Sequence, residues 1–542
     1  MRRARIDVRK LGCFVRRLAG ILLFFASAAL TAADSASLNL SLEEATRRAL
    51  ERNTTLAVER ESTQQAALGI LSARGSYDVL WTADFGWRKH TDPINSAFSG
   101  APAGELAPKN ESITGSTALT QLLPTGGTAS FSSGWGRATT DGAFTVLSPS
   151  YSTNLGVALR QPLLRDLMID PAREAIRVAA ANRDASDARL SRVVSDTVTQ
   201  VDAAYWSLVA ARRNVVSIQS AVDLAERQLS DTKERVEAGT LGETEIAQPT
   251  AERERRKGDL ALSRQRVAEA ENTLKLLVLG DPSDPSWSSE LVPTDDPESE
   301  MRPATVDEAL PVALSRRPEI AEAKARRTGA EVEVEARRSD VLPRLDLVAG
   351  YQRRGLAGRL NPNAIGLNDQ PIVLPPQLEG SWGRSYGTIR ENDFPDASVG
   401  VSFSVPIGNH TARANLAIAK SVMTQTAVGV SAAEQQVQAE VRNAVFALES
   451  ARQRIEAARA GRVAAETQLY AEQQRFEVGL STNFLVLTRQ NDLTNARVTE
   501  TSALTDYRKA DTELARATGV LLEQRRVALA ATRRGSDGSP AR

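Results

Sequence analysis

The sequence predicts an α+β membrane protein built from two internal repeats, each a long helical rod joined to short strands. Three observations support this fold class. Short motifs occur twice in the same order, apolar residues recur every seven positions over long segments, and shorter segments alternate apolar with small or polar residues. Doubled motifs indicate a repeated unit, a seven-residue period indicates packed helices, and alternation indicates strands with one apolar face.

The first 33 residues have the order of a secretory signal. Seven basic residues within 1–17 precede an apolar run that extends from Leu18 to Leu30, and small residues follow. The apolar run is too short for a transmembrane anchor. Cys13, the one cysteine of the chain, precedes this run, whereas a lipoprotein signal places its cysteine after it. We therefore expect residues 1–33 to be a signal peptide for export.

The composition argues against several functional classes. The 542 residues include 67 Lys and Arg and 67 Asp and Glu, so the formal net charge is zero, whereas a nucleic-acid-binding protein is normally basic. The two histidines, His90 and His410, have no cysteine or carboxylate at metal-ligand spacing. We therefore expect no metal, no cofactor, no nucleic-acid partner and no enzyme activity.

Two motifs occur once in each repeat. The segment 41–52 recurs as 305–316, at an offset of 264 residues, and 235–239 recurs as 475–479, at an offset of 240. Each copy of the first motif begins with a hydroxyl residue followed three positions later by glutamate, which is the pattern of a helix capping box. The two pairs are Ser41 with Glu44 and Thr305 with Glu308.

These motifs also give the domain boundaries. After the signal peptide we expect a first repeat at 34–280, with a helix, strands and a long helical hairpin. A linker at 281–304 precedes the second repeat at 305–521. The last residues, 522–542, are basic and rich in small polar residues, which predicts a disordered tail.

Apolar residues recur every seven positions in the two longest helical segments, 165–237 and 411–477. A strict seven-residue period predicts left-handed coiled-coil packing, because the pattern of a straight helix drifts away from it. The first series is Val201, Leu208, Val215, Val222, Leu229 and Val236, and the second is Val441, Leu448, Ile455, Arg462, Leu469 and Phe476. At 1.5 Å per residue each long helix spans about 100 to 110 Å. The expected shorter helices alongside them are 54–75, 243–279, 318–340 and 483–521.

Four segments alternate apolar residues with small or polar residues: 79–88, 154–160, 345–351 and 399–407. Such strands occur in transmembrane barrels, with apolar side chains outward, and also in soluble sheets with one buried face. Long polar stretches on one side and helices on the other favour a barrel above a helical body; these stretches are 89–112, 138–151 and 353–396. The expected lipid-facing side chains are Trp81, Phe85, Trp87, Val157, Val401 and Phe403. A further hairpin is expected at 115–136, but the pattern does not place it in the barrel.

In these features the chain resembles the TolC family of outer-membrane efflux and secretion channels. The resemblance covers 41–521 and depends on the doubled opening motif, on Arg-Gln-Pro-Leu-Leu-Arg at 160–165 and on Val-Gly-Leu-Ser at 478–481. It implies a homotrimer in which one transmembrane β-barrel continues into a periplasmic α-helical barrel. It also implies a passive exit duct in contact with outer-membrane lipid. A periplasmic adaptor protein and an inner-membrane pump would supply this duct with drugs, small molecules or proteins, as in tripartite efflux or type I secretion.

The resemblance further implies that the two helix-turn tips dock the adaptor. The tip residues are Gly239, Thr240 and Leu241 in the first repeat and Val478, Gly479, Leu480 and Ser481 in the second. Family members often carry aspartate just after the second tip, whereas 483–488 contains no carboxylate here. Glu243 and Glu245, after the first tip, are therefore the candidates for an acidic ring at the pore entrance. The alternative is that both are solvated surface residues.

A second interpretation explains the same patterns without a channel. A secreted or periplasmic coiled-coil structural protein with a small soluble sheet would also show heptads and alternation. The aromatic side chains on alternating strands in both repeats favour the channel.

Overall fold

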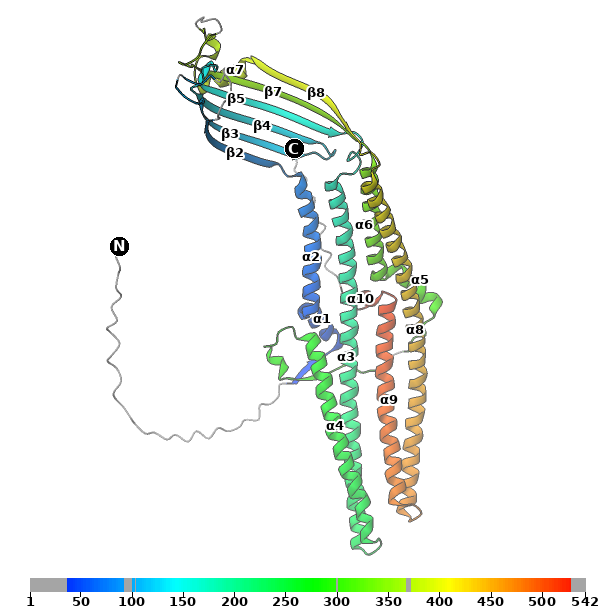
Figure 1. The fold of residues 1–542 in the computed structure, drawn as a ribbon. Coiled ribbons are helices and arrows are strands. Elements are labelled where there is room, and N and C mark those ends of the chain that lie inside the picture. The colour runs from blue at the N-terminus through cyan, green and yellow to red at the C-terminus, as the bar shows by residue number, and fades with distance from the viewer. Residues whose placement is uncertain (1–36, 92–99, 103, 299–300, 367–371, 528–542) are drawn as a thin grey trace, which may run out of the picture.

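The computed structural model describes residues 37–91, 100–102, 104–298, 301–366 and 372–527. The molecule is elongated, with one sheet at one end and long helices that extend from the sheet to two hairpin tips (Figure 1). The expected signal peptide lies outside the described residues.

The helices form a wall that is one helix thick along most of its length (Figure 1). Two helices run from the sheet to the tips, and pairs of shorter helices lie end to end beside them. Contacts between the helices give the order α2, α3, α6, α8 near the sheet and α4, α3, α9, α8 near the tips. The bounds are α2 Thr54–Arg74, α3 Pro171–Glu237, α4 Ala247–Val278, α6 Pro318–Val341, α8 His410–Glu477 and α9 Asn483–Ala517.

Local capping explains where these helices differ from the expected segments. The helix expected from residue 165 begins at Pro171, because Asp170 Oδ1 accepts hydrogen bonds from the backbone N–H groups of Ala172 and Arg173 at 2.8 and 2.9 Å. The helix expected to end at 521 ends at Ala517, because the chain reverses at Gly519 with φ = 74°. The helix expected from 243 begins as a 3-10 turn, η2 (Glu243–Ile246), before α4.

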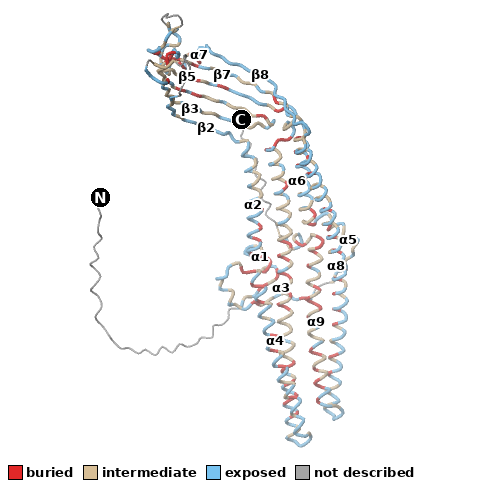
Figure 2. Tube along the Cα trace, viewed as in Figure 1, coloured by how far each residue is buried: buried red, intermediate tan, exposed pale blue. Residues whose placement is uncertain are grey.

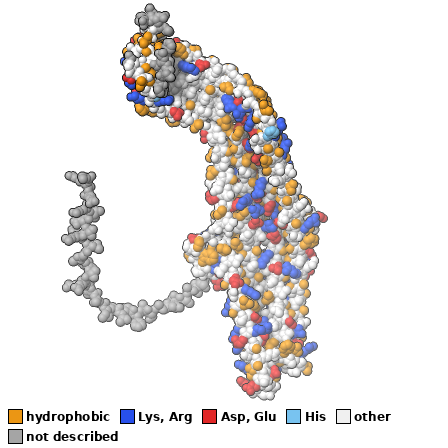
Figure 3. Space-filling view, viewed as in Figure 1, with side chains coloured by type: hydrophobic (Ala, Val, Ile, Leu, Met, Phe, Trp, Pro, Cys, Tyr) orange, Lys and Arg blue, Asp and Glu red, His pale blue; other side chains and the backbone are white. Residues whose placement is uncertain are grey.

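The heptad positions predicted from the sequence face the interior of the wall. All members of both series are buried or half-buried, including Val201 and Val441, which have no measurable exposure. Arg462, the one polar member, forms ion pairs with Glu466 at 3.0 Å and with Glu500 of α9 at 2.6 Å. Acidic and basic side chains are intermixed over the visible face of the helices (Figure 3).

Small elements surround the middle of the wall, where buried positions are concentrated (Figure 2). They are α1 (Leu42–Arg52), α5 (Val306–Arg316) and a parallel pair of strands, β1 (Ser37–Leu40) and β6 (Glu290–Pro293). The expected linker at 281–304 therefore contains a strand that pairs with the start of the first repeat. Ordered structure also continues past 521, where a disordered tail was expected, because Leu521–Gln524 form α10.

Neither expected capping box is complete. Ser41 Oγ accepts a hydrogen bond from the Glu44 backbone N–H at 3.2 Å, which is one half of the motif. The Glu44 carboxylate bonds to Arg47 and Arg48 instead of the Ser41 backbone. Thr305 precedes α5 but makes no side-chain capping bond.

The sheet has six antiparallel strands in the order β2-β3-β4-β5-β7-β8. The bounds are β2 Leu80–Thr91, β3 Lys109–Leu122, β4 Thr128–Thr140, β5 Leu147–Pro162, β7 Arg344–Leu360 and β8 Phe394–Ser404. The hairpin that the sequence analysis left unplaced thus forms two inner strands of the sheet, β3 and β4. Expected loop segments are also shorter, because strands extend into all three and α7 (Trp382–Glu391) lies within 353–396. The fourth expected strand ends at Ser404, before Pro406.

Candidate functional sites

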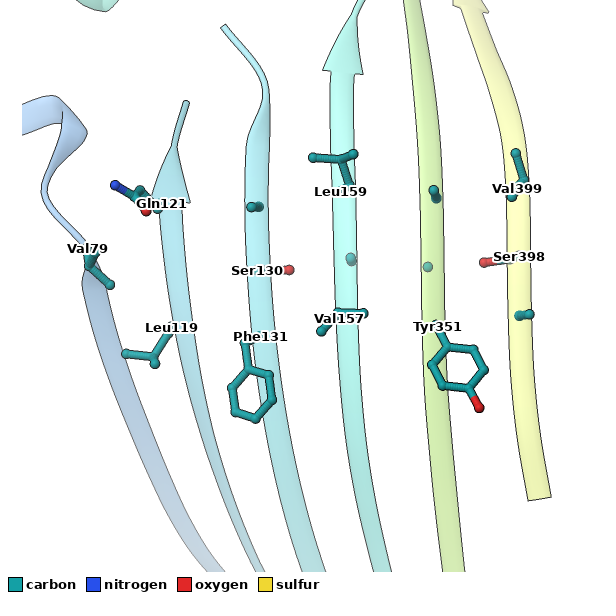
Figure 4. A pocket seen from close by; sticks show the side chains of 15 residues that line it. Val79, Leu119, Gln121, Ser130, Phe131, Val157, Leu159, Tyr351, Ser398 and Val399 are labelled. Carbon is teal, nitrogen blue, oxygen red and sulfur yellow. The ribbon is translucent and has the colours of Figure 1, made fainter. Parts of the chain in front are cut away.

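The strand register gives the sheet two chemically different faces. Cross-strand partners place Trp81, Leu119, Phe131, Val157, Tyr351 and Ala397 in one row across all six strands. Figure 4 shows Leu119, Phe131, Val157 and Tyr351 of this row on neighbouring strands, along an open apolar depression of about 670 Å³. We call this side the apolar face.

The six side chains that the sequence analysis assigned to lipid all lie on the apolar face. Alternate residues of a strand point to the same face, and each of the six either belongs to this row or is an even number of residues from the row member on its strand. Each is more than half exposed, from 52% for Val157 to 73% for Phe85. Six large apolar side chains on one exposed surface are unusual for a soluble protein. The register therefore gathers the predicted residues on one surface, while lipid contact itself remains a prediction.

A second row of aromatic side chains lies nearer the outer end of the sheet. Trp135 is 6.1 Å from Phe85 and 5.5 Å from Trp382 of α7, and Tyr151 is 5.0 Å from Trp382, between ring centroids. A Cβ at residue 115 would lie 2.4 Å from the Trp135 ring, so glycine is required there. On β2, Trp81 belongs to the first row, while Phe85 and Trp87 belong to the second row, about 13 and 20 Å further along the strand.

The opposite side of the sheet, the polar face, carries small and charged residues. A typical row contains Thr82, Ala118, Ser132, Gly156, Gln352 and Asp396. Charges on this face are paired between strands. Arg160 Nε lies 2.9 Å from Asp346 Oδ2, and Arg354 Nη2 lies 3.0 Å from Asp396 Oδ2. The polar face therefore suits contact with water.

The two hairpin tips have the same backbone geometry. Gly239 and Gly479 have φ values of 74° and 79°, which a residue with a Cβ adopts only with strain. Beyond each glycine, the next backbone N–H bonds back to the carbonyl of Arg235 or Arg475, at 2.9 and 2.8 Å. This is the Schellman motif, so both glycines end their helices as the sequence predicted.

The tips contact each other and expose apolar side chains. The Arg235 guanidinium carbon lies 4.6 Å from the centroid of the Phe476 ring, which joins the two hairpins through a cation–π contact. Leu480 is 79% exposed and Val478 is 69% exposed. Ser481 Oγ instead bonds to the Glu472 carboxylate.

The remaining predicted tip residues belong to the first hairpin. Thr240 is exposed and its Oγ1 donates to the Arg235 carbonyl at 2.8 Å, while Leu241 is half-buried. Glu243 and Glu245 are exposed in η2, at the start of the returning helix. A ring of carboxylates needs several copies of this turn, so the acidic ring remains a prediction.

Sequence reasoning missed a buried polar contact between the two hairpins. Gln228 Nε2 of α3 donates to Asn483 Oδ1 of α9 at 2.5 Å, and Asn483 Nδ2 donates to Thr232 Oγ1 at 3.3 Å. All three side chains are buried. Gln228 and Thr232 are polar residues next to the heptad position Leu229, which could have indicated a polar contact there. Their partner, Asn483, is 251 or more residues away in the chain, so the contact itself could not be predicted.

Sequence reasoning also missed a buried carboxylate at the middle of the wall. Asp202 is fully buried, and its Oδ2 accepts from Thr512 Oγ1 at 2.7 Å and from Arg525 Nη2 at 2.5 Å. Burial raises the pKa of Asp202, while Arg525 and Thr512 oppose that shift. Arg525 thereby fixes the segment after α10 to α3.

Two further findings concern the described residues only. Among them, no group of three or more His, Cys, Asp and Glu side chains is placed to hold a metal ion. No helix in these ranges has the length and hydropathy needed to cross a bilayer.

A sheet with an apolar and a polar face, continued by long helices that end in paired tips, is the architecture of an outer-membrane channel protein. The sequence matches the outer membrane efflux protein family over residues 120–279 and 309–520, which is more than half of the chain. The chain belongs to this family, which comprises channel proteins and not enzymes, and it is located in the outer membrane with an extension into the periplasm.

Individual relatives agree with this assignment. The outer membrane efflux protein BepC of Brucella suis is 26% identical over 360 residues, which cover 66% of this chain and 71% of BepC. A membrane protein of Pseudomonas aeruginosa has a similar fold, with a TM-score of 0.62 and 19% identity over 88% of this chain and 93% of its own. The CmeC outer membrane channel of Campylobacter jejuni is similar at a TM-score of 0.61 and 16% identity, over 89% and 86% of the two chains. The resemblance to TolC-type channels is thus confirmed.

Proposed function

We propose that the protein is the passive exit duct of a tripartite efflux or type I secretion assembly. It works as a homotrimer, receives cargo from a periplasmic adaptor and an inner-membrane pump, and releases that cargo outside the cell. Membership of the efflux family and the name of BepC support efflux ahead of protein secretion.

One observation carries this proposal: the apolar face exposes two rows of aromatic side chains, about 13 to 20 Å apart along the strands. Transmembrane barrels present an apolar band about 25 Å tall between two aromatic girdles. The apolar face would contact lipid and the polar face would line the duct. The soluble structural protein of the second interpretation would leave this apolar surface in water, which is unfavourable.

The helical part accounts for the rest of the duct. The corresponding elements of the two repeats, such as α3 with α8 and α4 with α9, would form one wall segment per copy. The tips, with Leu480 and Val478 exposed, would dock the adaptor, and Glu243 and Glu245 would form the acidic ring at the entrance.

Deletion of the gene and complementation test this function. We expect the deletion strain to become more susceptible to exported drugs and the complemented strain to recover. Fractionation with crosslinking should find the protein in the outer membrane as a trimer. A soluble periplasmic monomer, or unchanged susceptibility to every compound and unchanged secretion, would contradict the proposal.

A further inference from the structure

We infer that the β3–β4 hairpin widens the membrane barrel, so that three copies of this chain close a single barrel of eighteen strands. The inference rests on the proposed homotrimeric channel and adds its strand number and the seam between copies. It depends on the two free edges of the sheet, on the matching widths of sheet and helical wall, and on how the hairpin is seated.

The sheet ends in two strands that each have one neighbour within the described chain. β2 has 12 residues and β8 has 11, and they run in opposite directions because every neighbouring pair between them is antiparallel. Free edges cannot face lipid, because their backbone N–H and C=O groups would lack hydrogen-bond partners. β8 of one copy can continue the antiparallel ladder along β2 of the next, and closure of the ring removes every edge.

The helical wall continues the same two edges. α2 and α4 lie on the β2 side of the wall and α8 lies on the β8 side (Figure 1). α8 carries exposed apolar side chains on two heptad positions that differ from its buried series. One position holds Ile418 and Phe446, and the other holds Val428, Val463 and Tyr470.

The facing edge also exposes apolar side chains. Val58 and Leu71 of α2 are 70% and 66% exposed, and Leu262 and Leu276 of α4, also exposed, are two heptads apart. A helix with a second heptad series needs a second helical partner. A neighbouring copy whose α2 and α4 pack against α8 supplies it.

The width of the six-stranded sheet agrees with the width of the wall. Six strands at about 4.8 Å spacing, tilted by about 40°, span about 38 Å. Four helices, packed about 8 to 10 Å apart, span about 32 to 40 Å. One number of copies therefore closes both layers. Without β3 and β4 the sheet would be narrower, at about 25 Å by the same estimate.

The hairpin is fixed to the rest of the protein at its inner turn. Thr125 Oγ1 donates to Gln161 Oε1 at 2.7 Å, and Gln161 Nε2 donates to the Thr125 carbonyl at 3.0 Å. Gly126 has φ = 79°, and a Cβ there would lie 2.4 Å from the Asp166 carbonyl oxygen, just before α3. The hairpin is thus seated over α3 as an integral part of the barrel wall.

Eighteen strands give a backbone diameter of about 35 Å, against about 24 Å for twelve. Barrels of this strand number leave an aqueous channel. The outer section of the duct would therefore admit bulkier solutes than a barrel with four strands per copy.

Cysteine crosslinking tests the seam. Thr82→Cys on β2 is combined in turn with Ser398→Cys, Ser402→Cys and Ser404→Cys on β8, and all four positions lie on the polar face. The one native cysteine, Cys13, precedes the expected cleavage site. We expect at least one pair to give covalent dimers and trimers. The control, Thr82→Cys with Ser132→Cys on the inner strand β4, should give none. Crosslinks within one copy only, or equal crosslinking in the control, would overturn the seam.

Polymer exclusion tests the width. Neutral polyethylene glycols of graded size are added from the outer side of channels in planar bilayers. Removal of 109–140 joins β2 to β5, which remain antiparallel, and should reduce the radius of the largest polymer admitted by about one third. An unchanged polymer-size limit in the shortened variant would refute the inference that the hairpin widens the barrel, and would leave the exit-duct proposal unaffected. The exit-duct proposal fails instead if the intact protein forms no outer-membrane trimer. If the shortened variant does not assemble, electron microscopy of the intact trimer decides, because a strand number other than eighteen overturns the inference.

Discussion

Replacement of Leu480 by aspartate separates a docking tip from a simple helix cap. Leu480 is 79% exposed, so the folded copy has little packing to lose, and an exposed substitution usually changes stability by less than about 0.5 kcal/mol. Its backbone N–H bond to the Arg475 carbonyl, at 2.8 Å, is available to aspartate as well. Trimer abundance should therefore be normal.

Binding should respond very differently if an adaptor covers this side chain. Full burial of a leucine side chain contributes about 1.5 to 3 kcal/mol, which corresponds to roughly tenfold to hundredfold in affinity at each tip. A buried, unpaired carboxylate would weaken binding further. A trimer carries three copies of Leu480, which would compound the loss, so we expect export to be abolished.

The assay measures drug susceptibility and trimer abundance in the same strain. Leu106→Asp is the matched control, because Leu106 is 94% exposed in the segment between β2 and β3, at the opposite end of the molecule. The control should leave both readings unchanged. Normal export with Leu480→Asp would refute the reasoning and leave the glycine turn as a helix cap only.

Three further predictions concern other parts of the molecule. Val401→Arg, on the apolar face, should destabilise the inserted barrel by about 2 to 4 kcal/mol per copy if the residue lies near the bilayer midplane, and should lower trimer yield. Ser402→Arg, on the polar face, should leave assembly intact and alter conductance. Equal assembly defects from both substitutions would contradict the assigned faces. Burial raises the pKa of Asp202 above 3.8, so the folded state binds its proton more tightly and the stability contributed by this group falls as pH rises above 3.8. The melting temperature of wild-type trimers relative to Asp202→Asn should therefore decrease with rising pH, and an increase would contradict this. Joint replacement of Glu243 and Glu245 by glutamine should reduce cation selectivity in bilayer recordings, and unchanged selectivity would favour solvated surface residues.

The long helices could be predicted from the sequence because their seven-residue period repeats over many turns. The buried Val201 and Val441 show that the period identified the packed face. The glycine turns were predictable for a similar reason, since a helix reversal requires positive φ and glycine supplies it at Gly239 and Gly479.

The hairpin β3–β4 was expected from its turn but was not placed in the barrel, because its alternation is weak. Gly115 stands where a large apolar residue would complete the pattern, and its place is filled in space by the Trp135 ring from the neighbouring strand. The apolar face is therefore continuous only when neighbouring strands are paired, because a side chain of one strand covers a glycine of the next. The residue pattern of one strand alone cannot reveal that a side chain from the neighbouring strand covers its glycine.

The polar contacts between helices were missed because each joins residues far apart in the chain. Asp202 and Arg525 are 323 residues apart, and Arg525 lies in a segment whose composition resembles a disordered tail. Nothing in either local sequence indicates the partner.

The unbroken course of α3 has a mechanical consequence. Its 67 residues extend about 100 Å from the base of the sheet to a tip, and it contacts α2, α4, α6 and α9 on the way. Its hairpin is tied to the second one through Arg235 and Phe476. A force applied by a partner at either tip would therefore be transmitted along this continuous helix. Both hairpins of a copy would move together relative to the middle of the wall, where buried side chains are concentrated.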